Sequence, residues 1–135
     1  MRTLKLTIAY DGTRYAGWQV QASRAQRAER RQHPTIQGTL EHVLQQILQE
    51  RVRVVGSGRT DAGVHALAQV AHVRTHSQLS SDRLLRSINQ LLPRDLAVMK
   101  IQPASETFHA RFDVVTKRYR YRIYTGPVVP PFLRP

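Results

Sequence analysis

Residues 3–10 read TLKLTIAY, in which Leu4, Leu6 and Ile8 alternate with Thr3, Lys5 and Thr7. An apolar side chain at every second position is typical of a strand with one face buried. The triplet Asp11-Gly12-Thr13 follows directly and has the residue types of a turn. The sequence therefore predicts that the fold begins with a half-buried strand over residues 3–10.

Two later segments carry apolar residues at helical spacing. Thr35 is a suitable N-cap for the first helix, which we expect to end near Arg51. Ser80 or Ser81 can cap the second helix, and Pro93 should stop it. The apolar positions are Ile36, Leu40, Val43, Leu44, Ile47 and Leu48 in the first segment and Leu84, Leu85, Ile88, Leu91 and Leu92 in the second.

Further strands are predicted between and after these helices. Short apolar runs occupy residues 52–55, 67–75 and 95–102, and a run rich in β-branched and aromatic residues occupies 114–124. The predicted order is β-α-β-β-α-β followed by one more strand. The first six elements match the split βαβ, ferredoxin-like arrangement, an α+β fold that RNA-recognition modules share. We expect two helices on one face of an antiparallel sheet, with the other face left for RNA or another domain.

Length and composition limit the class of protein. A chain of 135 residues with 41% hydrophobic and 22% charged residues suggests one folded domain. The sequence has no cysteine, which excludes disulfide scaffolds, thiolate nucleophiles and cysteine-bearing zinc sites. No apolar run approaches the ~20 residues of a membrane-spanning helix, and the N-terminus resembles a strand more than a signal peptide. We expect a cytoplasmic protein.

The charge indicates the kind of partner. The 21 basic residues outnumber the 9 acidic ones and give a net charge of +12, and all but three of the cations are arginine. Such an excess favours nucleic acid or an anionic membrane, although an arginine-rich, solvated surface would have the same composition. Residues 22–33, ASRAQRAERRQH, lack large apolar side chains. They predict a mobile basic loop or, alternatively, an arm that becomes ordered on RNA.

The segment 55–65, VGSGRTDAGVH, places three glycines around Arg59 and Asp61 between two predicted strands. Its glycine spacing differs from that of a dinucleotide-binding loop, and a P-loop would need Gly-Lys followed by Ser or Thr. A purely structural role is possible for the two charged residues. In that role Asp61 closes an Asx-turn with Gly63, and Arg59 pairs with the carboxylate.

The octad GRTDAGVH at 58–65 resembles the signature of the TruA-type tRNA pseudouridine synthases. Other segments resemble later or earlier motifs of the same family, in the same order along the chain. They are YDGT at 10–13, GWQ at 17–19, TIQG at 35–38, NQLLP at 89–93, FHARF at 108–112 and KRYRY at 117–121. The resemblance therefore spans nearly the whole chain and favours a functional role for Asp61.

The resemblance implies an isomerase that converts uridine to pseudouridine at nucleotides 38, 39 and 40 of the tRNA anticodon stem-loop, with no cofactor and no metal. The family's catalytic aspartate corresponds to Asp61. A carboxylate there can act as a nucleophile on the sugar or base, or as a base that removes the ribose 2′ proton. The sequence does not distinguish these two mechanisms.

Two further substrate-binding residues follow from the resemblance. Arg59 is expected to pair with Asp61 and to support the space that the flipped nucleotide leaves. Tyr119 corresponds to the tyrosine that stacks on the substrate in the family, although strand periodicity alone also allows it to be a core aromatic. A base stacked on an aromatic ring contributes ~1–3 kcal/mol.

Other candidates are weaker. Basic side chains that could contact phosphates are Arg14, Arg111, Arg118, Arg120 and Arg122. The trio His65, His72 and His76 gives only a weak indication of a metal site, and Trp18 is expected to pack under the first loop.

The resemblance also implies a homodimer and a second half of similar fold, so that residues 1–135 would be the N-terminal catalytic half. The alternatives are a non-catalytic RNA-binding module and a basic structural protein of an RNA assembly.

Overall fold

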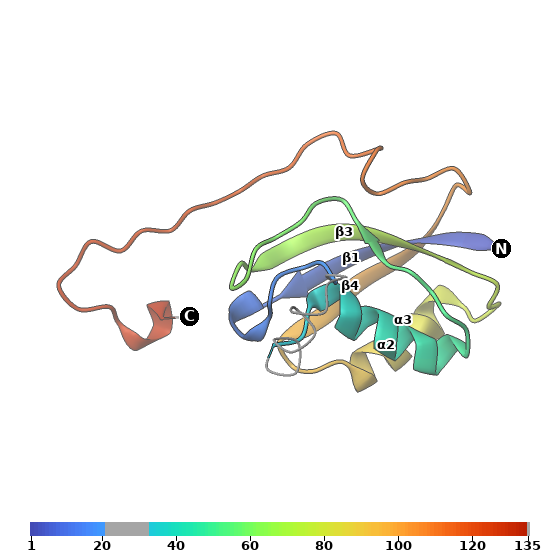
Figure 1. The fold of residues 1–135 in the computed structure, drawn as a ribbon, viewed down its shortest axis with the longest axis horizontal. Coiled ribbons are helices and arrows are strands. Elements are labelled where there is room, and N and C mark those ends of the chain that lie inside the picture. Colours follow the sequence, from blue (N-terminus) through green and yellow to red (C-terminus); the bar gives the residue numbers. More distant parts are fainter. Residues whose placement is uncertain (21–32, 135) are drawn as a thin grey trace.

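The computed structural model describes residues 1–20 and 33–134, and it shows two helices packed on one side of a four-stranded sheet (Figure 1). The strands are β1 (Arg2–Tyr10), β2 (Val55–Gly56), β3 (Ala66–Thr75) and β4 (Leu96–Ala104). The helices are α2 (Ile36–Leu48) and α3 (Ser81–Leu91), with short 3-10 turns at Gly12–Arg14 and Pro131–Leu133. The predicted order β-α-β-β-α-β is confirmed.

The sheet has the order β2-β3-β1-β4, and each neighbouring pair is antiparallel. β1 lies in the middle, so Leu6 is paired with Ala71 on one side and with Ile101 on the other. This topology is the α+β, ferredoxin-like arrangement that the sequence predicts. Its two central strands carry the loops that form the candidate site at one end of the sheet.

The core lies between the sheet and the helices. Leu4, Leu6 and Ile8 of β1 are fully buried, as the alternation in residues 3–10 predicts. Buried side chains of both helices meet them, among them Leu40, Leu44, Leu84 and Ile88. Burial of such leucine and isoleucine side chains is typically worth ~1.5–3 kcal/mol each, so this interface is the main source of folding free energy.

Both helix starts follow the predicted capping chemistry. The Thr35 hydroxyl accepts a hydrogen bond from the Gly38 amide at 3.1 Å, and the Ser80 hydroxyl accepts one from the Arg83 amide at 3.4 Å. Each bond satisfies an amide that the first helical turn leaves without a partner. The first helix ends at Leu48 rather than near Arg51, because Gln49 adopts a left-handed conformation with φ of 56° and terminates it.

Two strand predictions need correction. The strand expected over 52–55 is a two-residue pairing at Val55–Gly56, because the Val54 backbone instead bonds to side chains of α2. The strand expected over 114–124 does not form, and this segment is an extended chain outside the sheet (Figure 1). Its β-branched and aromatic composition favours an extended chain, but a strand also needs a neighbour to pair with.

The face of the sheet opposite the helices is partly covered by residues 105–113. The Ala110 amide donates to Nδ1 of the buried His72 at 3.1 Å, and the Phe108 ring lies edge-on to the same imidazole.

The basic loop that the sequence predicts over residues 22–33 lies outside the described part of the chain, except for His33. Within the described part, neither helix is both long and apolar enough to cross a membrane.

Candidate active site

Thr60 belongs to the loop 57–65 and is held against β1 and the segment that follows it. Its carbonyl accepts a hydrogen bond from the Trp18 amide at 2.9 Å, and its hydroxyl lies 2.8 Å from the Tyr10 hydroxyl. Gly17 has φ of +89°, and a side chain there would come within 2.6 Å of the Thr60 carbonyl. The backbone on the N-terminal side of Asp61 is therefore fixed by direct contact with β1 and its following turn.

The other end of the loop is held by the turn after β1. The Gly12 amide donates to Nδ1 of His65 at 3.0 Å, and a Cβ added at Gly12 would lie 2.0 Å from the Val64 carbonyl oxygen. The Val64 amide closes a turn onto the Asp61 carbonyl at 3.1 Å. Asp61 thus lies in a short turn that is anchored on both sides.

The Asp61 side chain is exposed at the tip of this anchored turn. Among the described residues, none donates a hydrogen bond to its carboxylate, so the Asx-turn with Gly63 that a purely structural role requires is not formed. The turn is closed by the backbone of Val64 instead. The Asp61 carboxylate is consequently available to a substrate.

Arg59 does not form the ion pair with Asp61 that the sequence analysis expects. Within the described part of the chain, no guanidinium nitrogen of Arg59 comes within 4.0 Å of that carboxylate. Arg59 instead lines a hollow beside Trp18, and Asp61 is not among the residues that line it. The two side chains therefore lie in different surroundings, although they belong to the same loop.

Tyr119 lies on the extended C-terminal segment with 61% of its surface exposed, so it is not a core aromatic. Two residues before it, the Lys117 side chain lies beside Gly58 of the loop. Burial raises the pKa of Tyr10, hydrogen bonds from Thr60 and Gln69 oppose the rise, and the Tyr119 phenol adds to it. The structure thus brings Tyr119 to the same end of the sheet as Thr60 and Asp61.

A hollow of about 210 Å3 lies beside the loop, and we call it the basic hollow. Four cationic side chains line it, and none of its lining residues is acidic. The lining is completed by Trp18, polar side chains and backbone of the loop; the cations are Arg53, Arg59, Arg111 and Lys117. Trp18 is 3% exposed and packs against Gly56, as expected of a residue under the first loop.

Sequence reasoning did not single out Arg53 or Lys117 as members of this cluster. Arg53 lies five residues before the octad, and Lys117 lies more than fifty residues after it. Each belongs to an irregular segment whose path depends on tertiary contacts. For Arg53 the available signal is the excess of basic residues, which does not indicate which cations gather, whereas Lys117 begins the KRYRY segment at 117–121.

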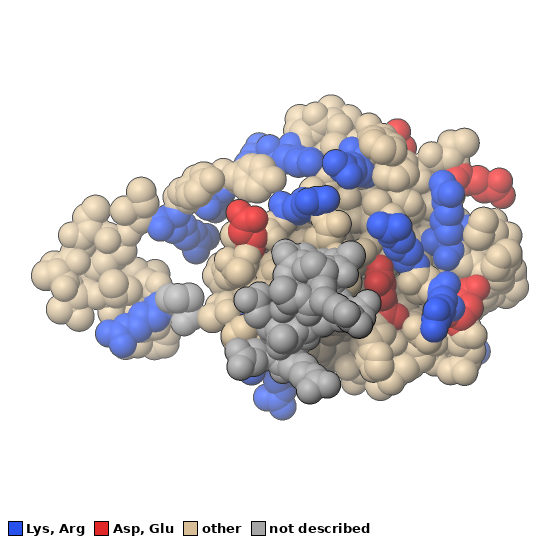
Figure 2. Space-filling model, viewed as in Figure 1, with Lys and Arg blue, Asp and Glu red and all other residues tan. Residues whose placement is uncertain are grey.

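The other weak candidates have different partners in the structure. Arg14 forms an ion pair with Asp95 at 3.0 Å, which removes it from the set of free cations. His65 bonds to Gly12, and His72 bonds to Ala110. Arg118, Arg120 and Arg122 remain exposed on the extended segment. Figure 2 shows basic side chains along this segment and across the adjoining side of the body.

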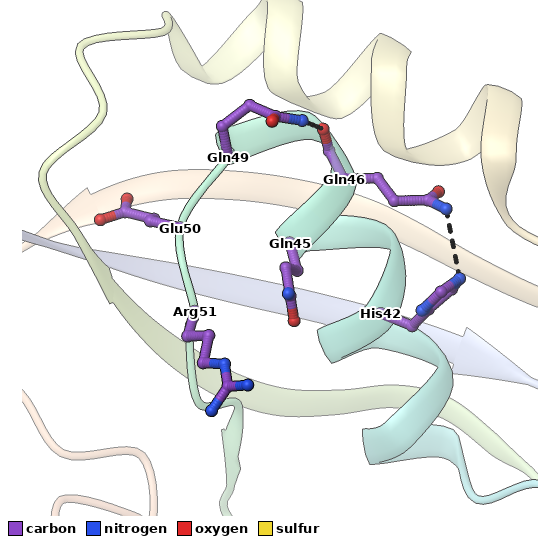
Figure 3. Close-up of a pocket in the computed structure, with 6 residues that line it drawn as sticks. All are labelled: His42, Gln45, Gln46, Gln49, Glu50 and Arg51. Atoms are coloured by element: carbon purple, nitrogen blue, oxygen red, sulfur yellow. Dashed lines mark hydrogen bonds between the residues drawn. The ribbon is translucent and has the colours of Figure 1, made fainter.

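A larger hollow, of about 390 Å3, lies at the C-terminal end of α2, where long amide side chains dominate the lining (Figure 3). Its carboxylate, Glu50, accepts hydrogen bonds from Thr75 and from the His76 amide, and the Thr75 bond is the main reason that its pKa is lowered. Glu50 therefore anchors the end of β3. The loop that carries Asp61 does not reach this hollow.

The chain matches the family described as tRNA pseudouridine synthase over residues 6–113. It is 48% identical to the tRNA pseudouridine synthase A of Oleidesulfovibrio alaskensis, covering all of this chain and 49% of that protein. The protein of the same name from Solidesulfovibrio magneticus is 45% identical over all of this chain and 47% of its own length. A tRNA pseudouridine synthase A 1 from Protochlamydia amoebophila is 42% identical over 99% of this chain and 49% of its own length. The chain thus spans about half the length of these curated relatives.

Proposed function

The chain belongs to the tRNA pseudouridine synthase family, and on that premise we propose that it isomerises uridine to pseudouridine at nucleotides 38, 39 and 40 of the tRNA anticodon stem-loop. In this reaction the bond between ribose C1′ and uracil N1 breaks, and the uracil turns. Its C5 then joins C1′, and the C5 proton is lost to solvent while N1 gains one. The atoms balance without an oxidant or a second substrate.

The exposed carboxylate of Asp61 is the observation that carries this proposal. It lies on a turn whose two ends are fixed by Thr60 and His65, and no described residue uses its oxygens. A carboxylate in this state can attack the sugar or base, or it can remove the ribose 2′ proton. Both mechanisms need a carboxyl group held in place with its oxygens free, which the anchored turn supplies.

The target uridine must leave the stack before its reacting atoms become accessible, which costs a few kcal/mol. Tyr119 is exposed near the loop, and we propose that its ring stacks on the extruded base. We propose that Arg59 supports the RNA strand from the basic hollow and not through an ion pair with Asp61. A homodimer, which the resemblance implies, belongs to the same proposal, and so does action in the cytoplasm, which the composition predicts.

Substitution of Asp61 tests the assignment. We expect Asp61→Ala to abolish pseudouridine formation, measured as release of tritium from tRNA labelled at uridine C5. Because the side chain is exposed and unbonded, tRNA affinity should stay within a few-fold. Asp82→Ala is the matched control, since Asp82 is an exposed aspartate on α3, away from the loop. Tritium release by the Asp61→Ala variant at the unsubstituted rate would refute the role of Asp61.

A second candidate is a non-catalytic RNA-binding module of the same fold. The chain spans about half the length of its curated relatives, which favours considering it. Both candidates predict salt-sensitive binding of tRNA, because contacts between cations and phosphates release counterions. Only the enzyme releases tritium, so a chain that binds tRNA without releasing tritium is the module.

A further inference from the structure

The basic hollow gathers four cations around one cavity without an acidic residue in its lining. Arg53, Arg59, Arg111 and Lys117 come from three separate segments of the chain. Within the described residues, none of the four forms an ion pair, whereas Arg14 on the same molecule pairs with Asp95. Like charges held near one another repel, so an anion in the hollow would relieve this repulsion.

Arg53 is placed by contacts on both sides of the neighbouring residue. The Val54 amide donates to the Glu41 carboxylate at 2.9 Å, and the Val54 carbonyl accepts from the Gln37 side chain at 3.0 Å. Val54 itself is fully buried. The backbone beside Arg53 is therefore fixed to α2, and only the exposed arginine side chain is left to move.

Arg59 and Arg111 are placed in the same way. Arg59 lies between Gly58, whose carbonyl accepts from the Gln69 side chain at 2.8 Å, and Thr60, whose carbonyl accepts from Trp18. Arg111 follows Ala110, whose amide is bonded to the buried His72. Three guanidinium groups thus extend from backbone positions that hydrogen bonds hold in place. The site therefore loses less conformational entropy when a ligand binds.

The remaining walls also favour an anion. Lys117 packs over Gly58, where a side chain at that position would come 3.1 Å from the ammonium nitrogen. Trp18 lines the same hollow, and its indole N–H donates to no described residue. The cavity therefore offers an ammonium and three planar guanidinium forks. Arginine forks match the oxygen geometry of a phosphate and can bind it through two hydrogen bonds.

We propose that the basic hollow binds a backbone phosphodiester of the RNA substrate, with Arg53 and Lys117 as binding residues in addition to Arg59 and Arg111. The inference rests on the proposed function, because it takes RNA as the substrate. Arg59 and Asp61 lie on one anchored loop, so a phosphate held in the hollow fixes the strand near the reacting nucleotide. The site therefore positions the substrate and takes no part in bond breaking.

Trp18 is the one tryptophan of the sequence, so its indole N–H resonance is unambiguous and reports on a residue that lines this hollow. The experiment follows that resonance in the 135-residue chain during titration with a five-nucleotide single-stranded oligouridylate, and separately with inorganic phosphate. Sodium chloride at matched ionic strength is the reference. We expect a saturable shift with the oligonucleotide. Arg53→Gln and Lys117→Gln should each weaken its binding at least threefold, and each lost contact should reduce the salt slope of log K by about 0.7.

Arg51→Gln is the matched control, because Arg51 is exposed two residues away but lines the hollow at the end of α2. It should leave oligonucleotide affinity within a factor of about 1.5 of the unsubstituted chain, because Arg51 lies outside the basic hollow and an isolated surface charge contributes little. An indole resonance that does not move with the oligonucleotide overturns the proposal. So does a shift with inorganic phosphate alone, or an equal loss in Arg51→Gln and Arg53→Gln, which would indicate bulk charge.

The Asp61→Ala variant separates this inference from the proposed function. The hollow does not include Asp61, so the variant should bind the oligonucleotide with unchanged affinity and an unchanged Trp18 shift. If it keeps that shift and also keeps forming pseudouridine, the catalytic assignment fails while the phosphate site stands. If Asp61 is required for turnover but Arg53→Gln changes no binding, the phosphate site fails alone.

Discussion

The loop 57–65 and the extended segment 114–130 both carry residues assigned to the substrate, yet they are built in opposite ways. The loop is anchored by bonds from Trp18, Tyr10 and Gly12 to Thr60 and His65. The segment forms no strand and leaves most of its side chains in solvent, with Val115 94% exposed. The difference suggests a division of work, in which the loop fixes the reacting group and the segment contributes contacts at low cost to folding.

Gly12→Ala is expected to have the largest effect on stability, because it breaks the anchoring of the loop. An alanine Cβ would lie 2.0 Å from the Val64 carbonyl oxygen, so the backbone of one of the two segments must shift. We expect a loss of about 3 kcal/mol, or roughly 10 °C in melting temperature. Thermal denaturation followed by circular dichroism measures it.

Gly63→Ala is the control for that prediction. Gly63 also lies in the loop and has φ of +80°, but nothing lies within 4 Å of an added Cβ. Only the cost of the left-handed conformation applies, about 1 kcal/mol. Equal losses for the two variants would mean that contact with the turn after β1 does not hold the loop.

Acid is expected to have an intermediate effect, through the strap 105–113 that leads into the extended segment. Burial lowers the pKa of His72, and the positive charges of His109 and Arg74 lower it further, while Asp113 opposes them. The unfolded chain therefore binds a proton at a higher pH than the folded chain. Stability from the neutral imidazole is complete above the unfolded pKa of about 6.5 and is lost as the pH falls below it.

Melting temperatures at pH 7.5 and pH 5.5 test this prediction. The unsubstituted chain should melt lower at pH 5.5, because protonation of Nδ1 removes the acceptor of the Ala110 amide. His72→Asn should show a smaller difference between the two pH values, because its amide does not titrate. An equal difference in both proteins would assign the acid sensitivity to other groups.

The sequence was informative where local chemistry decides the structure. Alternation in residues 3–10 and the caps at Thr35 and Ser80 predicted β1 and the starts of both helices, since each depends on neighbours a few positions away. The strand expected over 114–124 was wrong because pairing needs a partner that composition does not reveal. The extended conformation is local, whereas the hydrogen-bonded ladder is a tertiary property.

The candidate site divides in the same way. Asp61 could be proposed as the catalytic residue because the octad is contiguous. Its anchoring could not be predicted, because Gly12, Gly17 and Trp18 reach the loop from another segment. The expected pair between Arg59 and Asp61 followed from closeness in sequence. In the fold, Arg59 joins Arg53 around the basic hollow instead. Proximity along a chain does not determine which way two side chains point.

Tyr119→Leu should have the smallest effect on folding and is the sharpest test of the division between loop and segment. With 61% of the side chain exposed, its replacement should change stability by no more than about 0.5 kcal/mol. Loss of a stacked base costs ~1–3 kcal/mol, so single-turnover tritium release should fall by roughly 5- to 150-fold. Tyr121→Leu on the same segment, 87% exposed, is the control and should leave both quantities unchanged. If Tyr119→Leu lowers the melting temperature by several degrees and leaves turnover intact, the ring packs against Tyr10 as part of the fold, and the segment is structural after all.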